Sequence, residues 1–453
     1  DRFLSGNSNS DRIEFNFGGP DLFFQTIPGV FGKDLPGRFS FFLNGYGKMY
    51  DGNLPIASKL YPHRYWSSNF ISDEKSDKLM DRLASRENND WHLLYKMTWE
   101  LTPQKKLFIS YDASMNINQG YYMPRAFAST YFPYQYMNIL DNYNTITRDT
   151  RLINMNWTHT LSPKSFYEFT LGKFSTMEHS AVQDLPWTDY QERLDLEPIN
   201  YNIDNTDQDG NIQITYGDEF YDTGFAPEWY DLSSENTRMD IDWTYHTETR
   251  HKLKTGFEHT ITDIQVLDID EPWSGSSGFG ANYDSYNAKT YFGAFYFQDR
   301  IIFEGMTLNI GFRTDYWIPG RYVEDAIQDT SNIIITDEAR VIFEEETFDF
   351  PWAGDPFKMK ARISPRFGIS HPVTDNDVLY FYYGHFSQLP TFQYVYAKIN
   401  SKSQSTYQVF GNPNLNPKTT VQYELGVKHR FSEDQVLELK AYWKDMFDYE
   451  TSQ

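Results

Sequence analysis

The residues whose type and spacing most suggest chemistry are three closely spaced carboxylates, Asp204, Asp207 and Asp209, with a glycine directly after them. Such a segment lets a hard cation collect oxygen ligands, so it predicts a bound Ca²⁺ ion. The match to a calcium-binding loop is partial, because the twelfth position counted from Asn205 is Tyr216 and not Glu. The alternative is a solvated acidic loop without an ion.

A second candidate site is the aromatic-rich segment between residues 121 and 136. Aromatic rings can stack on sugar rings or grip an apolar ligand. They can equally form a small core within a loop, or a contact with another protein. The residues that we expect to contact a substrate are Tyr121, Tyr122, Tyr131, Tyr134 and Tyr136.

Motifs for catalysis are missing from the sequence. It has no Gly-x-Ser-x-Gly, no Gly-rich phosphate loop and no His-Glu-x-x-His. It has no cysteine, which excludes disulfides, Cys-ligated zinc and thiol catalysis. The ten histidines are scattered, so no His-rich loop predicts capture of haem or zinc. We therefore expect a protein that is not an enzyme.

Composition narrows the class of protein. The 453 residues include 40 Lys and Arg and 63 Asp and Glu, which gives a net charge of −23. This charge argues against nucleic acid as a partner, because phosphate binding needs a basic surface. No apolar run approaches the roughly 20 residues of a membrane-spanning helix. A membrane β-barrel stays possible, because its strands alternate between apolar and polar residues.

Alternation with period two is the strongest pattern in the chain. Met239, Ile241, Trp243 and Tyr245 alternate with polar residues, which predicts a strand with one apolar and one polar face. Similar runs recur along the whole sequence. They predict about 14 strands, over residues 11–18, 37–48, 90–101, 105–116, 149–160, 165–176, 236–247, 251–264, 287–302, 305–316, 360–371, 377–386, 419–430 and 435–446.

Short turns and long connections alternate between these strands. Short polar turns cover residues 102–105, 162–165 and 247–250, whereas residues 177–235 and 319–356 form long connections. This asymmetry is typical of bacterial outer-membrane barrels, which have short periplasmic turns and long extracellular loops. We therefore expect an all-β, antiparallel transmembrane β-barrel. The alternative is a soluble all-β protein, for example one that binds carbohydrate.

The cost of placing charge in lipid predicts which face points where. Arg362 and Arg366 share one face of their strand, opposite Ile363 and Phe367. A cation at the bilayer midplane costs roughly 2–4 kcal/mol, so the charged face must look into a wet lumen. The residues expected to face this lumen are Arg362, Arg366, Arg313, Asp240, Asp242, Glu168, Glu424 and Lys440.

Four segments resemble motifs of the TonB-dependent outer-membrane receptors. Residues 410–428 (FGNPNLNPKTTVQYELGVK) resemble the family segment GNPxLxPxxxxxYExGxK. Residues 363–368 (ISPRFG) are similar to the family strand SPRxG, and residues 380–390 (YFYYGHFSQLP) are similar to the strand that follows it. Residues 296–300 (YFQDR) are similar to a further strand. The resemblance covers roughly residues 287–446.

The resemblance implies a barrel of about 22 strands with a plugged lumen. Residues 1–453 would then form a partial barrel of about 14 strands, with the plug domain and the C-terminal strands absent from this chain. Loop lengths and aromatic content resemble the Bacteroidetes-type receptors that carry an N-terminal carboxypeptidase-regulatory-like domain. The function implied is plug-gated, energy-coupled import of a scarce nutrient across the bacterial outer membrane.

The resemblance also implies partners. These are TonB with the inner-membrane energising complex, outer-membrane lipid and lipopolysaccharide, and a surface lipoprotein. The alternative function is a structural or assembly role, in which the barrel anchors partner proteins at the cell surface. The sequence leaves the transported ligand and the oligomeric state open.

Overall fold

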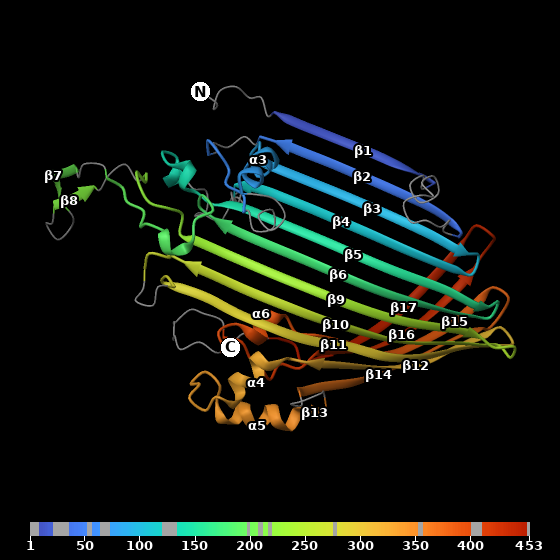
Figure 1. The fold of residues 1–453 in the computed structure, drawn as a ribbon. Coiled ribbons are helices and arrows are strands. Elements are labelled where there is room, and N and C mark those ends of the chain that lie inside the picture. The colour runs from blue at the N-terminus through green and yellow to red at the C-terminus, as the bar shows by residue number, and fades with distance from the viewer. Residues whose placement is uncertain are drawn as a thin grey trace.

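The computed structural model describes residues 9–20, 36–51, 57–63, 73–119, 134–196, 200–206, 212–215, 220–274, 279–351, 357–399 and 410–450. Fourteen strands form one sheet in which every strand is antiparallel to its neighbours in chain order (Figure 1). The strands are β1 (Ser10–Pro20), β2 (Arg38–Tyr50), β3 (Asn88–Thr102), β4 (Lys105–Gln119), β5 (Thr145–Ser162), β6 (Ser165–Ala181), β9 (Glu228–His246), β10 (His251–Asp270), β11 (Asn282–Phe303), β12 (Met306–Ile318), β14 (Phe357–Pro372), β15 (Asp377–Gln388), β16 (Lys418–Arg430) and β17 (Val436–Phe447). All 14 predicted strands are therefore confirmed, together with the antiparallel all-β class.

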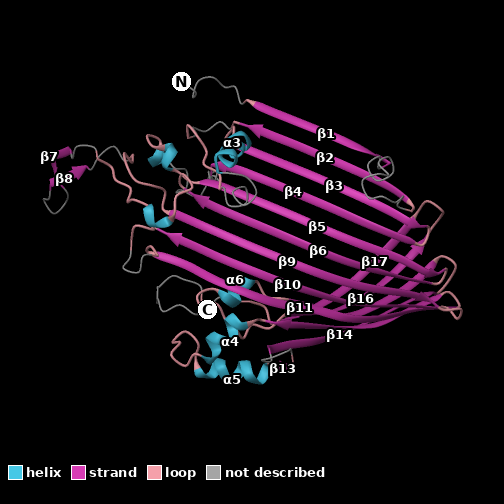
Figure 2. Ribbon diagram, in the orientation of Figure 1, coloured by secondary structure: helices cyan, strands magenta, loops and turns pink. Residues whose placement is uncertain are grey.

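The remaining elements lie off this path. β13 (Phe348–Phe350) pairs with β14, and β7 (Asn200–Thr206) pairs with β8 (Ile212–Thr215) in a separate small sheet. The helices gather at one end of the strands (Figure 2). They are α3 (Asp73–Leu83), α4 (Arg321–Gln328), α5 (Asp337–Glu346) and α6 (Phe392–Tyr396), with 3₁₀ turns at Tyr134–Tyr136, Leu140–Asn142 and Trp187–Asp189. None of the helices in the described ranges is long and apolar enough to span a membrane.

From β3 onwards, the strands are joined by short turns at one end and by longer connections at the other. Glu304 and Gly305, between β11 and β12, both have positive φ (45° and 82°), as a two-residue hairpin turn of type I′ requires. In the β14–β15 turn the hydroxyl oxygen of Thr374 accepts a hydrogen bond from the Asp377 amide at 3.0 Å. The predicted asymmetry between turns and loops is confirmed.

Several strands are much longer than predicted. β11 has 22 residues and extends over about 70 Å at roughly 3.3 Å per residue. A tilted crossing of the bilayer needs only about 9–11 residues, so about half of β11 extends beyond it at the loop end. There the alternation is lost, because loops cover both faces: Val266 and Ile269 of β10 point to opposite faces and are both buried.

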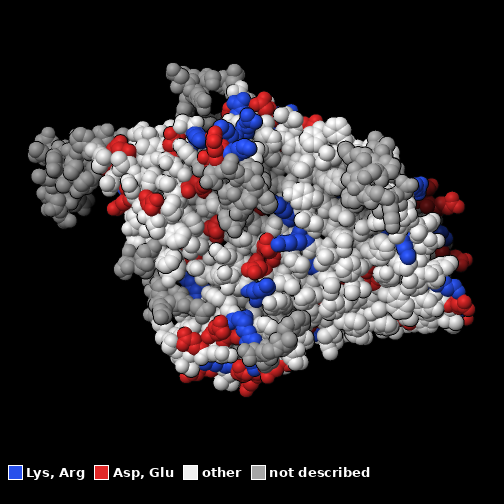
Figure 3. All heavy atoms as spheres, in the orientation of Figure 1, with Lys and Arg blue, Asp and Glu red and all other residues white. Residues whose placement is uncertain are grey.

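One face of the sheet is apolar, and between the loop end and the turns no second layer of described residues covers it. The register places Ile241 beside Phe257, and Phe257 beside Phe295. These three side chains are 42%, 36% and 46% exposed, as expected for groups that face hydrocarbon and not a shared protein core. Trp243 on the same face is exposed as well. In Figure 3, charged side chains are sparse on the strands between a belt of charges and the turn end.

The opposite, polar face is the concave one. α6 follows β15 along the chain, yet its Tyr396 packs against Tyr286 of β11, with ring centroids 6.2 Å apart. β12 and β14 lie between these two strands in the sheet. The contact is possible because the sheet curves around this face (Figure 1). In the described part of the chain β1 and β17 are edge strands, so the curved sheet is not closed.

Buried apolar residues gather at the loop end in three clusters. The largest lies on the polar face and holds α4, α5 and α6 against β10–β12 through residues such as Trp317, Val323 and Phe343. The other two lie on the apolar face, where Ile269 packs with the loop residues before β9 and Ile117 packs with Met80 of α3. These clusters fix the loops above the strands and thereby shape the mouth of the curved sheet.

Candidate ligand-facing wall and cavity

The predicted lumen-facing residues all lie on the polar face of the sheet. The register pairs Asp242 with Glu168, Asp240 with Glu258, and Arg362 with Asp315. The same register places the four remaining predicted residues on this face as well. Those are Arg313 opposite Ser364, Arg366 opposite Gly384, Glu424 opposite Tyr382, and Lys440 opposite Gly426. The alternation therefore predicted the charged face correctly.

A ladder of ion pairs crosses four strands of this face. Arg238 of β9 contacts Glu258 of β10 at 3.2 Å. Glu258 also contacts Arg313 of β12, which in turn contacts Asp315 at 2.6 Å. The pair between β10 and β12 reaches across β11 at Ala294, whose small side chain leaves room for it. The partners hold one another in place in a wall that stays wet, because their side chains are only partly buried.

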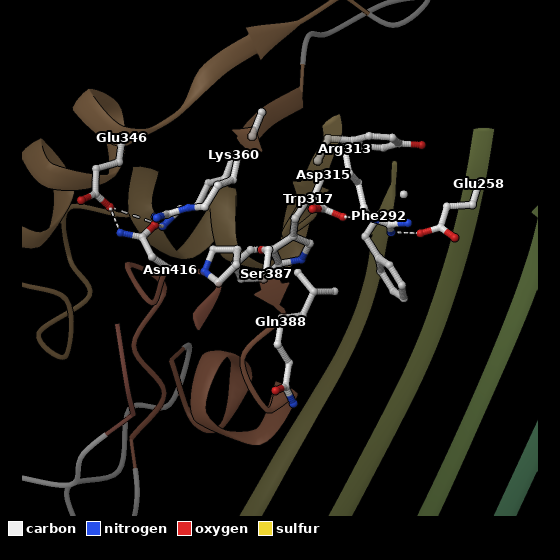
Figure 4. A pocket seen from close by; sticks show the side chains of 16 residues that line it. Glu258, Phe292, Arg313, Asp315, Trp317, Glu346, Lys360, Ser387, Gln388 and Asn416 are labelled. Atoms are coloured by element: carbon white, nitrogen blue, oxygen red, sulfur yellow. Dashed lines mark hydrogen bonds and ion pairs between the residues drawn. The ribbon is translucent and has the colours of Figure 1, made fainter. Parts of the chain in front are cut away.

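A cavity of about 490 Å³ opens beside this ladder and is lined in part by Glu346 of α5 (Figure 4). Figure 4 shows Glu258 and Arg313 on one side of it and Lys360 with Glu346 on the other. A volume of this size is in the range of small-molecule sites. The charged lining consists of Glu258, Asp315 and Glu346 with Arg313, Lys360 and Arg362, and the uncharged lining includes Phe292, Trp317, Ser387, Gln388 and Asn416. Three carboxylates and three cations suit a polar ligand held by charge-assisted hydrogen bonds.

Lys360 fixes the floor of the cavity. Its ammonium donates to the backbone oxygens of Asn414 and Leu415 at 3.1 and 3.2 Å and to Oδ1 of Asn416 at 3.1 Å. Glu346 lies 3.6 Å away, and the side chain of Lys360 is only 4% exposed. A buried cation is tolerable here because all three of its donors are used. Lys360 thereby ties residues 414–416 to β14.

The motif segment around residues 410–417 is held by further contacts at this end. The Gly411 amide donates to the Ala397 carbonyl at 2.7 Å, and a Cβ at Gly411 would lie 2.5 Å from the carbonyl oxygen of Val395. Asn414 Nδ2 donates to the carbonyl of Ala339 in α5 at 2.9 Å. The segment therefore joins α5, α6 and β14, which explains the residue types of Gly411 and Asn414 by the architecture.

Of the five predicted substrate-contacting tyrosines, the structure describes the side chain of Tyr136 alone. This side chain is 4% exposed, and its hydroxyl donates to the Phe225 carbonyl at 3.1 Å. Burial raises the pKa of Tyr136. Its ring packs on Tyr143 and Tyr221, which is the loop core that we considered as the alternative. Tyr121, Tyr122 and Tyr131 lie outside the described residues, and of Tyr134 only the backbone is described.

The predicted calcium site falls largely outside the described residues. Asp204 lies in β7, where the structure describes the backbone and not the side chain. Asp207 and Asp209 lie in the undescribed connection between β7 and β8. The Ca²⁺ site therefore stays a prediction.

Three residues that line the cavity were not predicted from the sequence, namely Glu258, Asp315 and Lys360. Each is a polar residue of an alternating strand, as when Glu258 follows the outward-facing Phe257. Alternation places such residues on the polar face but does not say which of them meet. That depends on the register between strands and on the loops above.

One family model matches the chain. It is described as TonB dependent receptor-like, beta-barrel, and it covers residues 115–453. A search of curated proteins gives no match.

Solved structures share the fold at low sequence identity. A mutant of the ferric enterobactin receptor PfeA from Pseudomonas aeruginosa superposes with a TM-score of 0.51 at 13% identity, over 98% of this chain and 51% of that one. The unliganded ferric citrate transporter FecA gives a TM-score of 0.50 at 10% identity, over 98% of this chain and 50% of that one. This chain thus spans about half the length of the receptors that it resembles.

Proposed function

Since the chain belongs to the TonB-dependent receptor β-barrel family of the bacterial outer membrane, we propose that the whole protein imports a scarce nutrient across that membrane by plug-gated, energy-coupled transport. The family match over residues 115–453 carries this proposal. The exposed apolar face and the charged concave face support it, because an importer must meet lipid outside and a polar ligand inside. The proposed partners are a plug domain, TonB and the inner-membrane energising complex.

The proposed role of the concave wall is to receive the ligand as it leaves the outer mouth. The cavity beside Glu258 and Arg313 suits a polar ligand with both anionic and hydrogen-bonding groups. The cations of its lining can pair with the anionic groups, and its carboxylates can accept hydrogen bonds. Ferric enterobactin and ferric citrate, after which the two similar receptors are named, are ligands of this kind.

We also propose two sites in the outer loops, one that contacts the substrate and one that binds Ca²⁺. Tyr121, Tyr122, Tyr131 and Tyr134 would contact the substrate through their rings, because aromatic faces suit sugars and apolar groups. A Ca²⁺ ion held by Asp204, Asp207 and Asp209 would stiffen the connection between β7 and β8. Lipopolysaccharide around the barrel, a surface lipoprotein and the Bacteroidetes-type N-terminal domain belong to the same proposal.

The test uses the full-length gene in its own bacterium. Deletion of this gene and, separately, loss of TonB function should abolish growth on the same limiting nutrient. Arg362→Gln, in the cavity, should then weaken uptake, whereas Arg38→Gln, near the turn end, should leave it unchanged. If deletion changes no uptake but releases proteins from the cell surface, the barrel is an anchor for partners and the import proposal fails.

A further inference from the structure

Two histidines and two aspartates meet on the apolar face at the loop end, outside the wall described above. They are His63, His179 at the end of β6, Asp184 and Asp231 of β9. Asp184 Oδ1 lies 2.9 Å from His63 Nδ1 and 3.6 Å from His179 Nε2, and His179 Nδ1 lies 3.0 Å from Asp231 Oδ1. One ligand atom each from His63, His179 and Asp231 lies within 4.8 Å of the others.

Contacts from three parts of the chain hold the two imidazoles in place. The His63 amide donates to Oγ1 of Thr147 in β5 at 2.9 Å, which fixes the segment 57–63 on the sheet. The edge of the Trp229 ring packs on His179, with ring centroids 5.3 Å apart. Trp229 itself donates from Nε1 to the Leu185 carbonyl at 3.1 Å. The four side chains are therefore positioned before any ion binds.

The electrostatics of the cluster favour a bound cation. The rings of His63 and His179 are stacked with centroids 4.0 Å apart, which brings one nitrogen of each ring within reach of a single ion. Neutral imidazole is the form that binds metal. The side chains of Asp184 and Asp231 are 15% and 25% exposed, so both carboxylates lie in a partly dry place beside the imidazoles. Their negative charge would stabilise a bound divalent cation.

We propose that His63, His179 and Asp231 bind one divalent transition-metal ion, that Asp184 holds the two imidazoles in place, and that zinc is the ion that fits best. Two imidazoles with one carboxylate suit Zn²⁺, with a fourth position left for water, and they disfavour Ca²⁺ and Mg²⁺, which take oxygen ligands. Ligands of a tetrahedral Zn²⁺ ion stand roughly 3.3 Å apart, so the three ligand atoms, which lie within 4.8 Å of one another, need to close by up to about 1.5 Å.

The proposed ion would link separate segments of the chain at the loop end of the sheet. His63 comes from the segment before α3, His179 and Asp184 from β6 and the turn after it, and Asp231 from β9. His63 and Asp184 are 121 residues apart in sequence, and Asp231 lies still further along the chain. Metal binding would therefore order loops of neighbouring hairpins together, a role that import as such does not require. The proposal stands whether or not the barrel imports a nutrient.

The experiment uses the full-length protein in detergent, stripped with a chelator, dialysed against Zn²⁺ and then against metal-free buffer. Metal analysis should find one Zn²⁺ per chain. His63→Gln and His179→Gln should each lower this to near zero. The matched control is His429→Gln, which removes a single His–Asp pair with Asp377 (2.6 Å) at the turn end and should leave the zinc content unchanged.

Co²⁺ gives a readout that does not depend on the variants. Bound in place of Zn²⁺ to the wild-type protein, it should produce the visible absorption bands of a tetrahedral site. The heat-modifiable migration of folded barrels on gels shows whether each variant has folded. The proposal is overturned if the wild-type protein retains no zinc and gives no such bands, or if folded His63→Gln and His179→Gln variants keep their zinc. Two plain His–Asp pairs would then be the whole role of the cluster.

Discussion

Ile241→Arg on the apolar face should destabilise the barrel strongly, whereas Thr170→Arg on the polar face of the neighbouring strand should not. Ile241 is five residues before the end of β9 at the turn, which places it about 13 Å from the turn along the bilayer normal for a strand tilted by about 40°. That depth is near the middle of the hydrocarbon layer, where arginine costs roughly 2–4 kcal/mol.

Thr170→Arg places the same charge where carboxylates are available. The register sets Thr170 opposite Asp240, which lies on the charged face. The new cation should therefore cost less than about 1 kcal/mol, as is usual for a solvated site with an opposite charge nearby. Both variants introduce the same arginine side chain. A difference in their free energies of unfolding therefore shows which face of the sheet meets lipid.

The measurement is the free energy of unfolding in guanidinium, with each variant refolded into lipid vesicles. The midpoint for Ile241→Arg should fall by an amount that corresponds to roughly 2–4 kcal/mol, and that for Thr170→Arg should change little. If Thr170→Arg is the destabilising change and Ile241→Arg is neutral, the faces are assigned the wrong way round. Equal losses would show that neither face meets lipid.

Three further outcomes are expected. Lys360→Met should cost about 1–3 kcal/mol, because it leaves the oxygens of residues 414–416 without their donor; hydrogen exchange should quicken in that segment and not at the turns. Glu258→Gln should weaken the ladder through Arg313 and lower uptake of a cationic ligand more than that of an anionic one, measured in whole cells. Burial lowers the pKa of Lys398, so the folded state binds this proton more weakly than the unfolded state. Stability should therefore rise as pH increases through the lowered pKa towards 10.5, and Lys398→Met should flatten that rise in unfolding titrations.

The alternating strands and their turns could be predicted from the sequence alone. Each strand residue between Met239 and Tyr245 reports its own surroundings, lipid or water, through its type, and the turn residues report the local backbone. Side-chain direction follows from period two, so the charged face was predicted before the register between strands was known. The motif at residues 410–428 indicated, from the sequence alone, the family to which the chain belongs.

Tertiary structure alone decided how far the strands extend and which side chains meet. Val266 and Ile269 lie where loops cover both faces, so period two no longer carries information there. Glu258 and Arg313 contact each other across an intervening strand, and His63 reaches Asp184 over 121 residues. A residue's type records the polarity of its surroundings, whereas its neighbours depend on strand register, sheet curvature and loop packing, which are set by the chain as a whole.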